Sequence, residues 1–244
     1  MRSGPDSSSA AAEPPVRPLV LLHGLGRTRL SMWRLARRAA ARGYSVHNVG
    51  YPSRRGTIAE HAERVGARLA ALSGRDGRLD AVTHSLGGIV LRAAVAAGWL
   101  DAAALRRVVM LAPPNAGSEL ADVLSRTPLF RFAVGPAGPQ LATGEAGVVA
   151  SLPPVPFETG VIAGARAANP LFARAFAGPN DGKVSVERAV VAGMRDFVTV
   201  ACGHTFIMDR PDVVRQIFRF LAAGEFARDE RGDSDDARRG ARSA

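Results

Sequence analysis

Six short runs of aliphatic and β-branched residues recur along the chain, and stretches with helical character separate them. The runs occupy residues 19–22, 45–49, 79–83, 108–111, 160–163 and 197–200. Short apolar runs of this kind are typical of strands that are buried on both faces, as in a parallel sheet. Strands that alternate with helices build βαβ units, in which helices cover both faces of the sheet. The sequence therefore predicts an α/β fold with a mostly parallel, twisted sheet of about six strands.

The expected helices carry recognisable start and stop signals. We expect Ser31 to cap a helix that runs to about residue 41 and ends before Gly43. Thr57 is expected to cap a second helix, which ends near Gly74. The segment after residue 85 has little polar surface, as expected for a helix that packs centrally on the sheet. A last helix is expected to begin near Pro211, because proline is favoured in the first helical turn.

Residues 82–88 read VTHSLGG, in which a strand end meets a serine and then a helix. This is the layout of a nucleophile elbow, a strained strand-to-helix turn that projects the serine hydroxyl from the sheet. The general pattern is Gly-x-Ser-x-Gly, and short patterns of this kind also occur by chance. Ser85 is therefore a candidate nucleophile, and the alternative is a serine in an ordinary tight turn.

A serine hydroxyl is a poor nucleophile until a neutral imidazole takes its proton, and a carboxylate must hold that imidazole in the right tautomer. His204 follows the run at 197–200 and precedes the last expected helix, which makes it the candidate base. The alternative for His204 is a loop histidine without a catalytic role. His47 and His61 precede the serine, and we expect them at strand and helix-surface positions.

The candidate acid is Asp181, in the segment Pro-Asn-Asp-Gly-Lys between the fifth run and His204. Enzymes with an elbow of this kind place the acid after the serine and before the histidine in the chain. Asp-Gly is also a strong turn signal, so the alternative is a turn former without a catalytic role. Other acidic residues remain as less favoured candidates: Asp196, Asp209, Asp101, Asp122 and Glu158.

Acyl transfer develops negative charge on the carbonyl oxygen, and a backbone N–H aimed at that position contributes about 3 kcal/mol. The segment Leu-His-Gly-Leu-Gly at 22–26 follows the first run, where one such donor is usually found. We expect the N–H groups of Leu25 and Leu86 to form this oxyanion hole. A tight strand-ending turn at residues 23 and 24 is the alternative, and both readings can hold because glycine lets the backbone approach a ligand.

Taken together, these segments resemble the α/β-hydrolase superfamily, and within it bacterial lipases and esterases and the GPI inositol-deacylase-like lipases. The resemblance covers most of residues 17–222 and rests on Leu-Leu-His-Gly, His-Ser-Leu-Gly-Gly, Asn-Asp-Gly, a late Gly-His and a Pro-x-x-Gly-Ser-like segment at 113–118. It implies Ser85 as nucleophile, Asp181 as acid, His204 as base, and Leu25 with Leu86 as oxyanion donors.

The chain departs from the family pattern at one position of the elbow. Thr83 stands where the first glycine is usual, and a β-branched residue crowds such a turn. We interpret the change as an adjustment of local packing that leaves the function intact.

Composition limits the partners of the chain. The formal net charge is +10, Lys183 is the only lysine, and the arginines are scattered, so we expect no nucleic-acid binding and only weak contact with anionic membrane surfaces. Cys202 is the only cysteine, which excludes an intrachain disulfide and a metal site built on thiolates. We expect no metal and no cofactor. No secretory signal or spanning stretch is recognisable, so we expect a soluble, cytoplasmic protein.

The chain is long enough for one α/β domain, which we expect at residues 16–226, with disordered tails at 1–15 and 227–244. Residues 115–157 hold six prolines and do not follow the βαβ pattern. We interpret them as a cap-like or lid-like insertion over the active-site edge, and the alternative is an ordinary long connection with a satellite core. The candidate substrate-binding residues are His23, Leu120, Leu124, Leu129 and Phe130.

The sequence thus predicts a serine carboxylic-ester hydrolase, of the lipase or esterase kind, that acts on ester or lipid substrates through an acyl-enzyme. An acyltransferase or a thioesterase with the same triad is the nearer alternative, because the nucleophile does not specify what attacks the acyl-enzyme. A binding protein without catalytic activity is the more distant alternative. The sequence specifies neither the acyl chain nor the oligomeric state.

Overall fold

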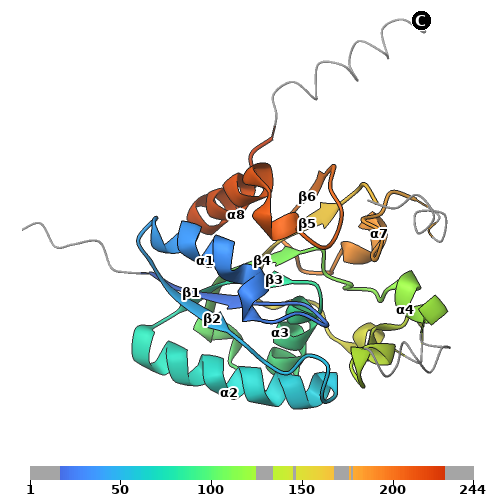
Figure 1. Cartoon of the computed structure of the whole chain (residues 1–244). Helices are drawn as coiled ribbons and strands as arrows, with labels where there is room; N and C mark the ends of the chain where they lie inside the picture. The colour runs from blue at the N-terminus through green and yellow to red at the C-terminus, as the bar shows by residue number, and fades with distance from the viewer. Residues whose placement is uncertain (1–16, 125–133, 145–146, 168–175, 177, 229–244) are drawn as a thin grey trace, which may run out of the picture.

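Six parallel strands form one sheet in the order β2-β1-β3-β4-β5-β6 (Figure 1). The computed structural model describes residues 17–124, 134–144, 147–167, 176 and 178–228. The strands are β1 Arg17–Leu22, β2 Tyr44–Val49, β3 Leu79–His84, β4 Leu105–Leu111, β5 Glu158–Gly164 and β6 Asp196–Val200. Each of the six predicted strands is confirmed, with ends that extend the apolar runs by one to three residues.

The hydrophobic core lies on both faces of the sheet, because successive side chains of a strand point to opposite faces. In β1, Leu19 and Leu21 join the core on one face, and Val20 and Leu22 join the core on the other. All four are fully buried. A strand that is apolar on both faces has no stable place at an exposed surface, which explains why continuous apolar runs form the centre of the sheet.

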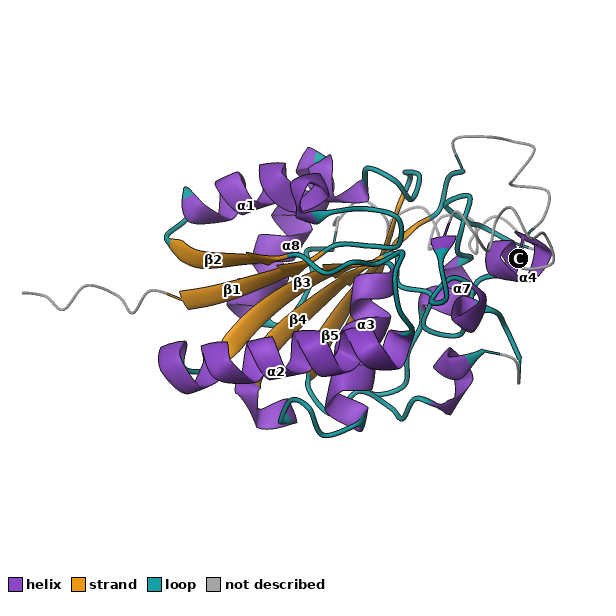
Figure 2. Cartoon of the chain, turned by 60° about the horizontal axis from the view of Figure 1, so that its bottom comes forward, coloured by secondary structure: helices purple, strands orange, loops and turns teal. Residues whose placement is uncertain are grey.

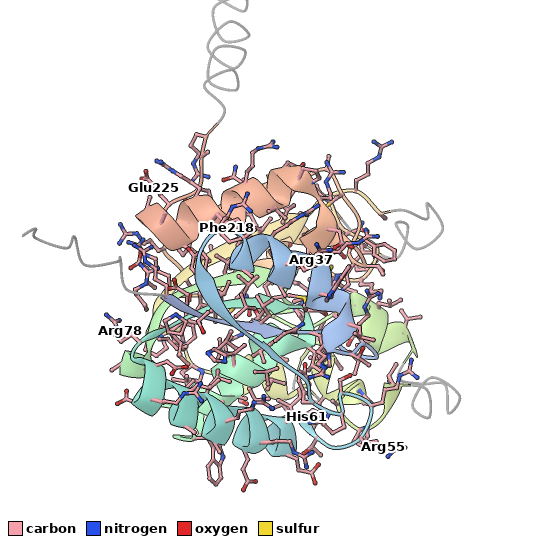
Figure 3. All side chains as sticks on the ribbon, turned by 60° about the vertical axis from the view of Figure 1, so that its left-hand side comes forward. Arg37, Arg55, His61, Arg78, Phe218 and Glu225 are labelled. Carbon is pink, nitrogen blue, oxygen red and sulfur yellow. The ribbon has the colours of Figure 1, made fainter. Side chains whose placement is uncertain are left out.

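Two layers of helices enclose the sheet (Figure 2). On one side lie α1 Trp33–Ala40 and α8 Pro211–Ala223, and on the other lie α2 Ile58–Asp76 and α3 Leu86–Ala96. Side chains fill the space between the layers, with Phe218 on the α8 side and His61 on the α2 side (Figure 3). His61 is 1% exposed and packs against Tyr51, so its expected helix-surface position is wrong.

Capping explains where the helices begin. The Thr57 side chain accepts a hydrogen bond from the N–H of Glu60, whose carboxylate accepts from the N–H of Thr57, which is a capping box. The expected cap at Ser31 is wrong: Thr28 accepts from the N–H of Leu30, and Ser31 lies inside a 3₁₀ turn, Arg29–Met32, that precedes α1. Pro211 opens α8 as predicted.

The carboxyl ends of β1 and β3 form the topological switch point of the sheet. The chain passes from β1 outward to β2 and then returns across β1 to β3, which starts the series that runs to β6. Loops after two such strands diverge and leave a crevice, where open α/β sheets bind ligands. Two predicted segments, Leu-His-Gly-Leu-Gly at 22–26 and the elbow serine, lie at these two strand ends.

The described part of the β4–β5 connection packs beyond the carboxyl end of the sheet and into the core. It contains α4 Glu119–Leu124 and the 3₁₀ helices Pro139–Leu141 and Val148–Ser151. The buried guanidinium of Arg92 on α3 donates to the backbone oxygens of Asn115, Leu152 and Pro153, which ties both ends of the connection to the sheet layer. Desolvation lowers the pKa of Arg92 to about 10, so it stays charged at neutral pH.

The predicted amino-terminal and carboxyl-terminal tails lie mostly outside the described residues. Residues 1–16 and 229–244 lie outside the described residues. Ala227 and Arg228, which fall in the expected carboxyl-terminal tail, hydrogen-bond to Gln216 and Asp196. Within the described ranges, no helix combines the length and the hydrophobicity that are needed to cross a membrane.

Candidate active site

Ser85 stands at the junction of β3 and α3 in a strained backbone conformation. Its φ is 51° and its ψ is −122°, and φ values in this region are rare for residues other than glycine. The strain is held by two backbone hydrogen bonds, in which Ser85 N–H donates to the Leu111 carbonyl and Gly88 N–H donates to the Ser85 carbonyl. Strained residues of this kind cluster at functional sites, because surrounding structure must fix them.

Two glycines let the loop after β1 approach this elbow closely. A Cβ atom on Gly24 would lie 2.9 Å from His84 Nδ1 and 3.1 Å from Ser85 Cβ. A Cβ atom on Gly87 would lie 2.9 Å from the backbone oxygens of both Leu22 and His23. Larger residues at these two positions would separate the β1 loop from the serine.

Thr83 fits the elbow because a glycine faces it. A Cβ atom on Gly88 would lie 3.1 Å from Thr83 Oγ1, so the absence of that Cβ makes room for the threonine. The Thr83 side chain is fully buried, and its hydroxyl finds no hydrogen-bond partner within the described residues. The departure from the usual glycine is thus matched by local packing.

His204 and Asp181 form a buried pair at the other side of the site. His204 Nδ1 lies 2.7 Å from Asp181 Oδ2, and both residues are about 95% buried. Because an ionised carboxylate only accepts hydrogen bonds, the proton of the neutral imidazole sits on Nδ1. Nε2 is then free of a proton and can accept one.

Backbone groups of the turn around Asp181 hold its carboxylate in place. Asp181 Oδ1 accepts from the N–H groups of Lys183 and Val184, at 2.9 Å each, and the N–H of His204 donates to the Asp181 carbonyl. The carboxyl end of β5 makes room for the turn, because a Cβ atom on Gly164 would lie 2.7 Å from Asp181 Cβ. The candidate acid therefore has its orientation set by backbone groups.

His84 connects the elbow to the base. Its Nε2 lies 3.0 Å from the His204 carbonyl, so the neutral ring donates from Nε2 and supports the backbone of the base. Burial, together with the neighbouring His204, lowers the pKa of His84 well below its usual value, and the ring is therefore neutral at pH 7. His84 is 2% exposed.

The loop after β1 is held by a stack of aromatic rings. His23 is fully buried and stacks on Tyr51 with ring centroids 4.4 Å apart. Tyr51 donates twice, from its hydroxyl to the His23 carbonyl and from its N–H to His23 Nε2. Desolvation lowers the pKa of His23, which agrees with an unprotonated Nε2 that accepts. These contacts fix the backbone that leads to Leu25.

The N–H groups of Leu25 and Leu86 are available for an oxyanion. Leu86 is the first residue of α3, where an N–H has no acceptor within its own helix. Leu25 lies in the turn that the Arg27 N–H closes by donating to the Gly24 carbonyl. Among the described residues, neither N–H takes part in a loop or cap hydrogen bond.

A cavity of about 300 Å³ brings the predicted residues together. Ser85, His204, Leu25 and Leu120 all line it. Its volume is at the lower end of the range of about 300–1,000 Å³ that is usual for small-molecule pockets. Asp181 lies behind His204 and does not line the cavity.

Among the predicted substrate-binding residues whose side chains the structure describes, Leu120 lines the cavity. His23 lies beneath the β1 loop in contact with Tyr51 and does not line it. Leu124 ends α4, but its side chain lies outside the described part of the structure, as do Leu129 and Phe130. The less favoured acids have other contacts: Asp196 accepts from the N–H of Phe226, and Glu158 pairs with Arg107.

Two cationic residues of the cavity are absent from the sequence prediction. Arg27 and Lys183 both line the cavity. Each stands two residues after a predicted one, Leu25 and Asp181 respectively, so proximity in the chain was the signal that could have found them. In the described part of the chain, no group of histidine, cysteine and acidic side chains has the arrangement of a metal site.

The amino-terminal part of the chain matches a known sequence family. Residues 2–135 match the family described as Domain of unknown function (DUF7379), which covers more than half of the 244 residues. The chain belongs to the DUF7379 family. The match contains Leu25 and Ser85 and ends before Asp181 and His204. No curated protein matches this DUF7379 chain in sequence.

Similar solved structures identify the α/β-hydrolase fold in this DUF7379 protein. The mature form of the lipase BlEst2 from Bacillus licheniformis superposes with a TM-score of 0.68 at 20% identity, over 87% of this chain and 93% of that one. The propeptide form gives 0.70 at 20% identity over 89% of this chain, which spans only 52% of that longer chain. Phospholipase PlaB from Legionella pneumophila gives 0.60 at 18% identity, over 79% of this chain and 54% of its own. Identities this low show the fold and leave the activity open.

Proposed function

We propose that this protein is a serine hydrolase of carboxylic esters, of the lipase or esterase kind. The observation that carries the proposal is the 2.7 Å pairing of His204 Nδ1 with Asp181 Oδ2, in which His204 lines the same cavity as Ser85. A neutral imidazole held by a buried carboxylate beside a serine is what nucleophilic acyl chemistry requires. The strained backbone at Ser85 supports the assignment further.

In the proposed mechanism, Ser85 Oγ attacks the ester carbonyl carbon while His204 Nε2 takes the hydroxyl proton. The carbonyl oxygen becomes an oxyanion, which the N–H groups of Leu25 and Leu86 stabilise. Collapse of the tetrahedral intermediate breaks the bond to the alcohol, which leaves with the proton from His204. Water then attacks the acyl-enzyme, and His204 takes and returns its proton in the same way.

Asp181 acts in this mechanism through His204. Its carboxylate keeps the Nδ1 proton in place and stabilises the imidazolium that forms at each proton transfer. Every step uses groups of the chain or water, so the proposal needs no metal and no cofactor.

The cavity lining supports an apolar acyl group as part of the substrate. Leu25, Leu120, Leu141 and Val184 contribute aliphatic side chains to the wall. Solved structures of similar fold are named a lipase, a phospholipase and a carboxyl esterase, and these names support ester or lipid substrates for this chain as well.

The proposal is tested by assaying the purified protein on p-nitrophenyl esters of graded chain length, beside Ser85→Ala. We expect hydrolysis with a chain-length optimum, and a loss of at least about 10⁴-fold in kcat for Ser85→Ala. Circular dichroism and thermal unfolding of both proteins show whether the variant is folded. Equal activity of wild type and Ser85→Ala on every ester would contradict the proposal.

Thioesters and added alcohols in the same assay separate hydrolysis of oxygen esters from related chemistry. Faster cleavage of thioesters than of matched oxygen esters would assign a thioesterase. Transfer of the acyl group to an added alcohol in preference to water would assign an acyltransferase. Release of the free acid from oxygen esters is the result that we expect.

A further inference from the structure

Two cationic side chains line the candidate cavity without an anionic partner. Arg27 and Lys183 come from two different segments, the loop after β1 and the acid turn. The Arg27 guanidinium lies over the Phe206 ring, 5.4 Å from its centroid, and makes no ion pair within the described residues. The Lys183 ammonium has no hydrogen bond or ion pair there either, since only its backbone groups bond to Asp181 and Ser118.

No acidic residue among the described lining residues balances these charges. Asp181 is nearby, but His204 and two backbone N–H groups already occupy its carboxylate. Elsewhere in the described chain, Arg188 pairs with Glu119 and Arg107 pairs with Glu158. Arg27 is partly buried and Lys183 is exposed, so both cations line the cavity where an anionic group can reach them. Within the described residues, the cavity lining therefore carries two cationic side chains and no acidic one.

The fields of both cations reach the elbow. Desolvation lowers the pKa of the Lys183 ammonium; Asp181 raises that pKa, and Arg27 lowers it further. The same two cations also contribute to the lowered pKa of His84, the residue before the serine, after burial and His204. The two cations thus act on the same small volume, next to the candidate nucleophile.

We propose that Arg27 and Lys183 form an anion subsite, so that the preferred substrate is an ester with a phosphate or carboxylate group within a few bonds of the ester. This inference rests on the proposed ester hydrolase. Arginine binds either anion through a planar fork, and lysine adds a mobile point charge. The aliphatic wall holds the acyl chain while the two cations hold the anion, which orients the ester across Ser85.

The first experiment compares pairs of esters in which one member carries an anionic group and the other a neutral one. One pair carries the anion on the acyl side, p-nitrophenyl hydrogen glutarate against p-nitrophenyl 5-methylhexanoate. The other carries it on the alcohol side, the butyryl ester of glycerol 3-phosphate against that of glycerol. We expect kcat/KM to favour the anionic member of at least one pair by tenfold or more, as estimated from the strength of charge-assisted hydrogen bonds.

Variants assign the preference to the two residues. We expect Arg27→Met with Lys183→Met to reduce the anionic-to-neutral ratio by about tenfold to hundredfold, and Lys183→Arg to retain it. Arg215→Met is the matched control, since Arg215 is exposed on α8 and lies outside the cavity, and it should retain the ratio. Raising the ionic strength from about 0.01 M to about 0.5 M should lower the preference of the wild type.

Binding measured without turnover separates this inference from the proposed function. We expect Ser85→Ala to bind hexyl phosphate or hexanoate in calorimetry at least tenfold more tightly than hexanol, and the added Arg27→Met and Lys183→Met changes to remove the difference. Ser85-dependent hydrolysis without any anion preference in either assay overturns the anion subsite and leaves the hydrolase standing. Anion binding in a protein that hydrolyses no ester supports the subsite and contradicts the hydrolase.

Discussion

Asp181 has two sets of hydrogen bonds, one on each carboxylate oxygen. Oδ2 faces His204 Nδ1, and Oδ1 accepts from the N–H groups of Lys183 and Val184. The backbone therefore holds the carboxylate through Oδ1, while Oδ2 orients the imidazole of His204. Both carboxylate oxygens must accept hydrogen bonds. A substitution that keeps the shape of the side chain but replaces one oxygen therefore breaks the hydrogen bonds of that oxygen.

We predict that Asp181→Asn lowers kcat by about 10³–10⁴-fold, because the amide group can stabilise the wrong tautomer of His204 and cannot neutralise its imidazolium. Ester hydrolysis measures the effect. Asp209→Asn is the control, since Asp209 ends a 3₁₀ helix and does not line the cavity, and it should retain most of the activity. Near-normal turnover by Asp181→Asn would assign the acid to another residue.

At single residues, the sequence predicted more of the arrangement of the candidate triad than of the residues that line the pocket. The motifs around Ser85, Asp181 and His204 indicate the order of these residues in the chain and the turns in which they lie. In the structure, Ser85 and His204 line one cavity, and Asp181 lies behind His204. Arg27 and Lys183 were not predicted, because a lone cation carries no motif and only its closeness in the chain to Leu25 or Asp181 could have indicated it. His61 was misplaced because its burial depends on Tyr51, which comes from another element.

At the level of elements, the carboxyl ends of β3 and β5 position the candidate chemistry. β3 ends at the elbow, and β5 ends at Gly164, whose missing side chain lets Asp181 and the Cys202 carbonyl approach. A Cβ atom at Gly164 would lie 2.7 Å from each of them. The strand end and the acid turn are therefore coupled by packing.

We predict that Gly164→Ala displaces the acid turn, destabilises the protein by about 1–3 kcal/mol and lowers kcat at least tenfold. Urea unfolding and ester hydrolysis measure the two effects. The matched control is Gly74→Ala in α2, where a Cβ atom would meet nothing within 4 Å. That change should stabilise the protein by about 0.5–1 kcal/mol, as alanine is favoured in a helix. If Gly164→Ala were as stable and active as wild type, the inferred packing between the end of β5 and the acid turn would not matter for stability or catalysis.

Strands were predicted better than helix ends. Apolar runs that are buried on both faces leave a strong signal, and all six strands were found. The start of a helix depends on which of several nearby side chains makes the capping hydrogen bond. The sequence predicted Ser31, but Thr28 makes that hydrogen bond. In the same way α2 continues past Gly74 to Asp76 and ends at Gly77, whose φ is 80°. The β4–β5 connection has no periodic pattern, and its packing through Arg92 and Asn115 depends on contacts between distant residues.

For the molecule as a whole, three buried histidines link stability to pH. His23, His61 and His84 are each at most 2% exposed, and desolvation lowers the pKa of all three below the usual 6.5. In the folded protein they stay neutral near that pH, whereas in the unfolded chain each takes up a proton as the pH falls through 6.5. The unfolded chain therefore binds more protons, and the free energy of unfolding falls on acidification.

We predict that the free energy of unfolding decreases between about pH 7.5 and about pH 5.5. Below pH 6.5, each of the three histidines should lower it by about 1 kcal/mol for every pH unit. Urea unfolding midpoints at the two pH values measure the effect. His84→Gln removes one titrating group and should make the dependence shallower, provided that the variant remains folded. Identical midpoints for the wild type at both pH values would show that the buried imidazoles do not titrate in this way.

The central claim is that Ser85 is a nucleophile activated by His204 and Asp181. Its most direct test is labelling with an alkyl p-nitrophenyl phosphonate, followed by mass spectrometry of the intact protein and of its peptides. We predict release of one p-nitrophenolate per chain, a single adduct on Ser85, no adduct in Ser85→Ala, and slower labelling in Asp181→Asn. An adduct on another residue, or equal labelling of wild type and Ser85→Ala, would contradict it.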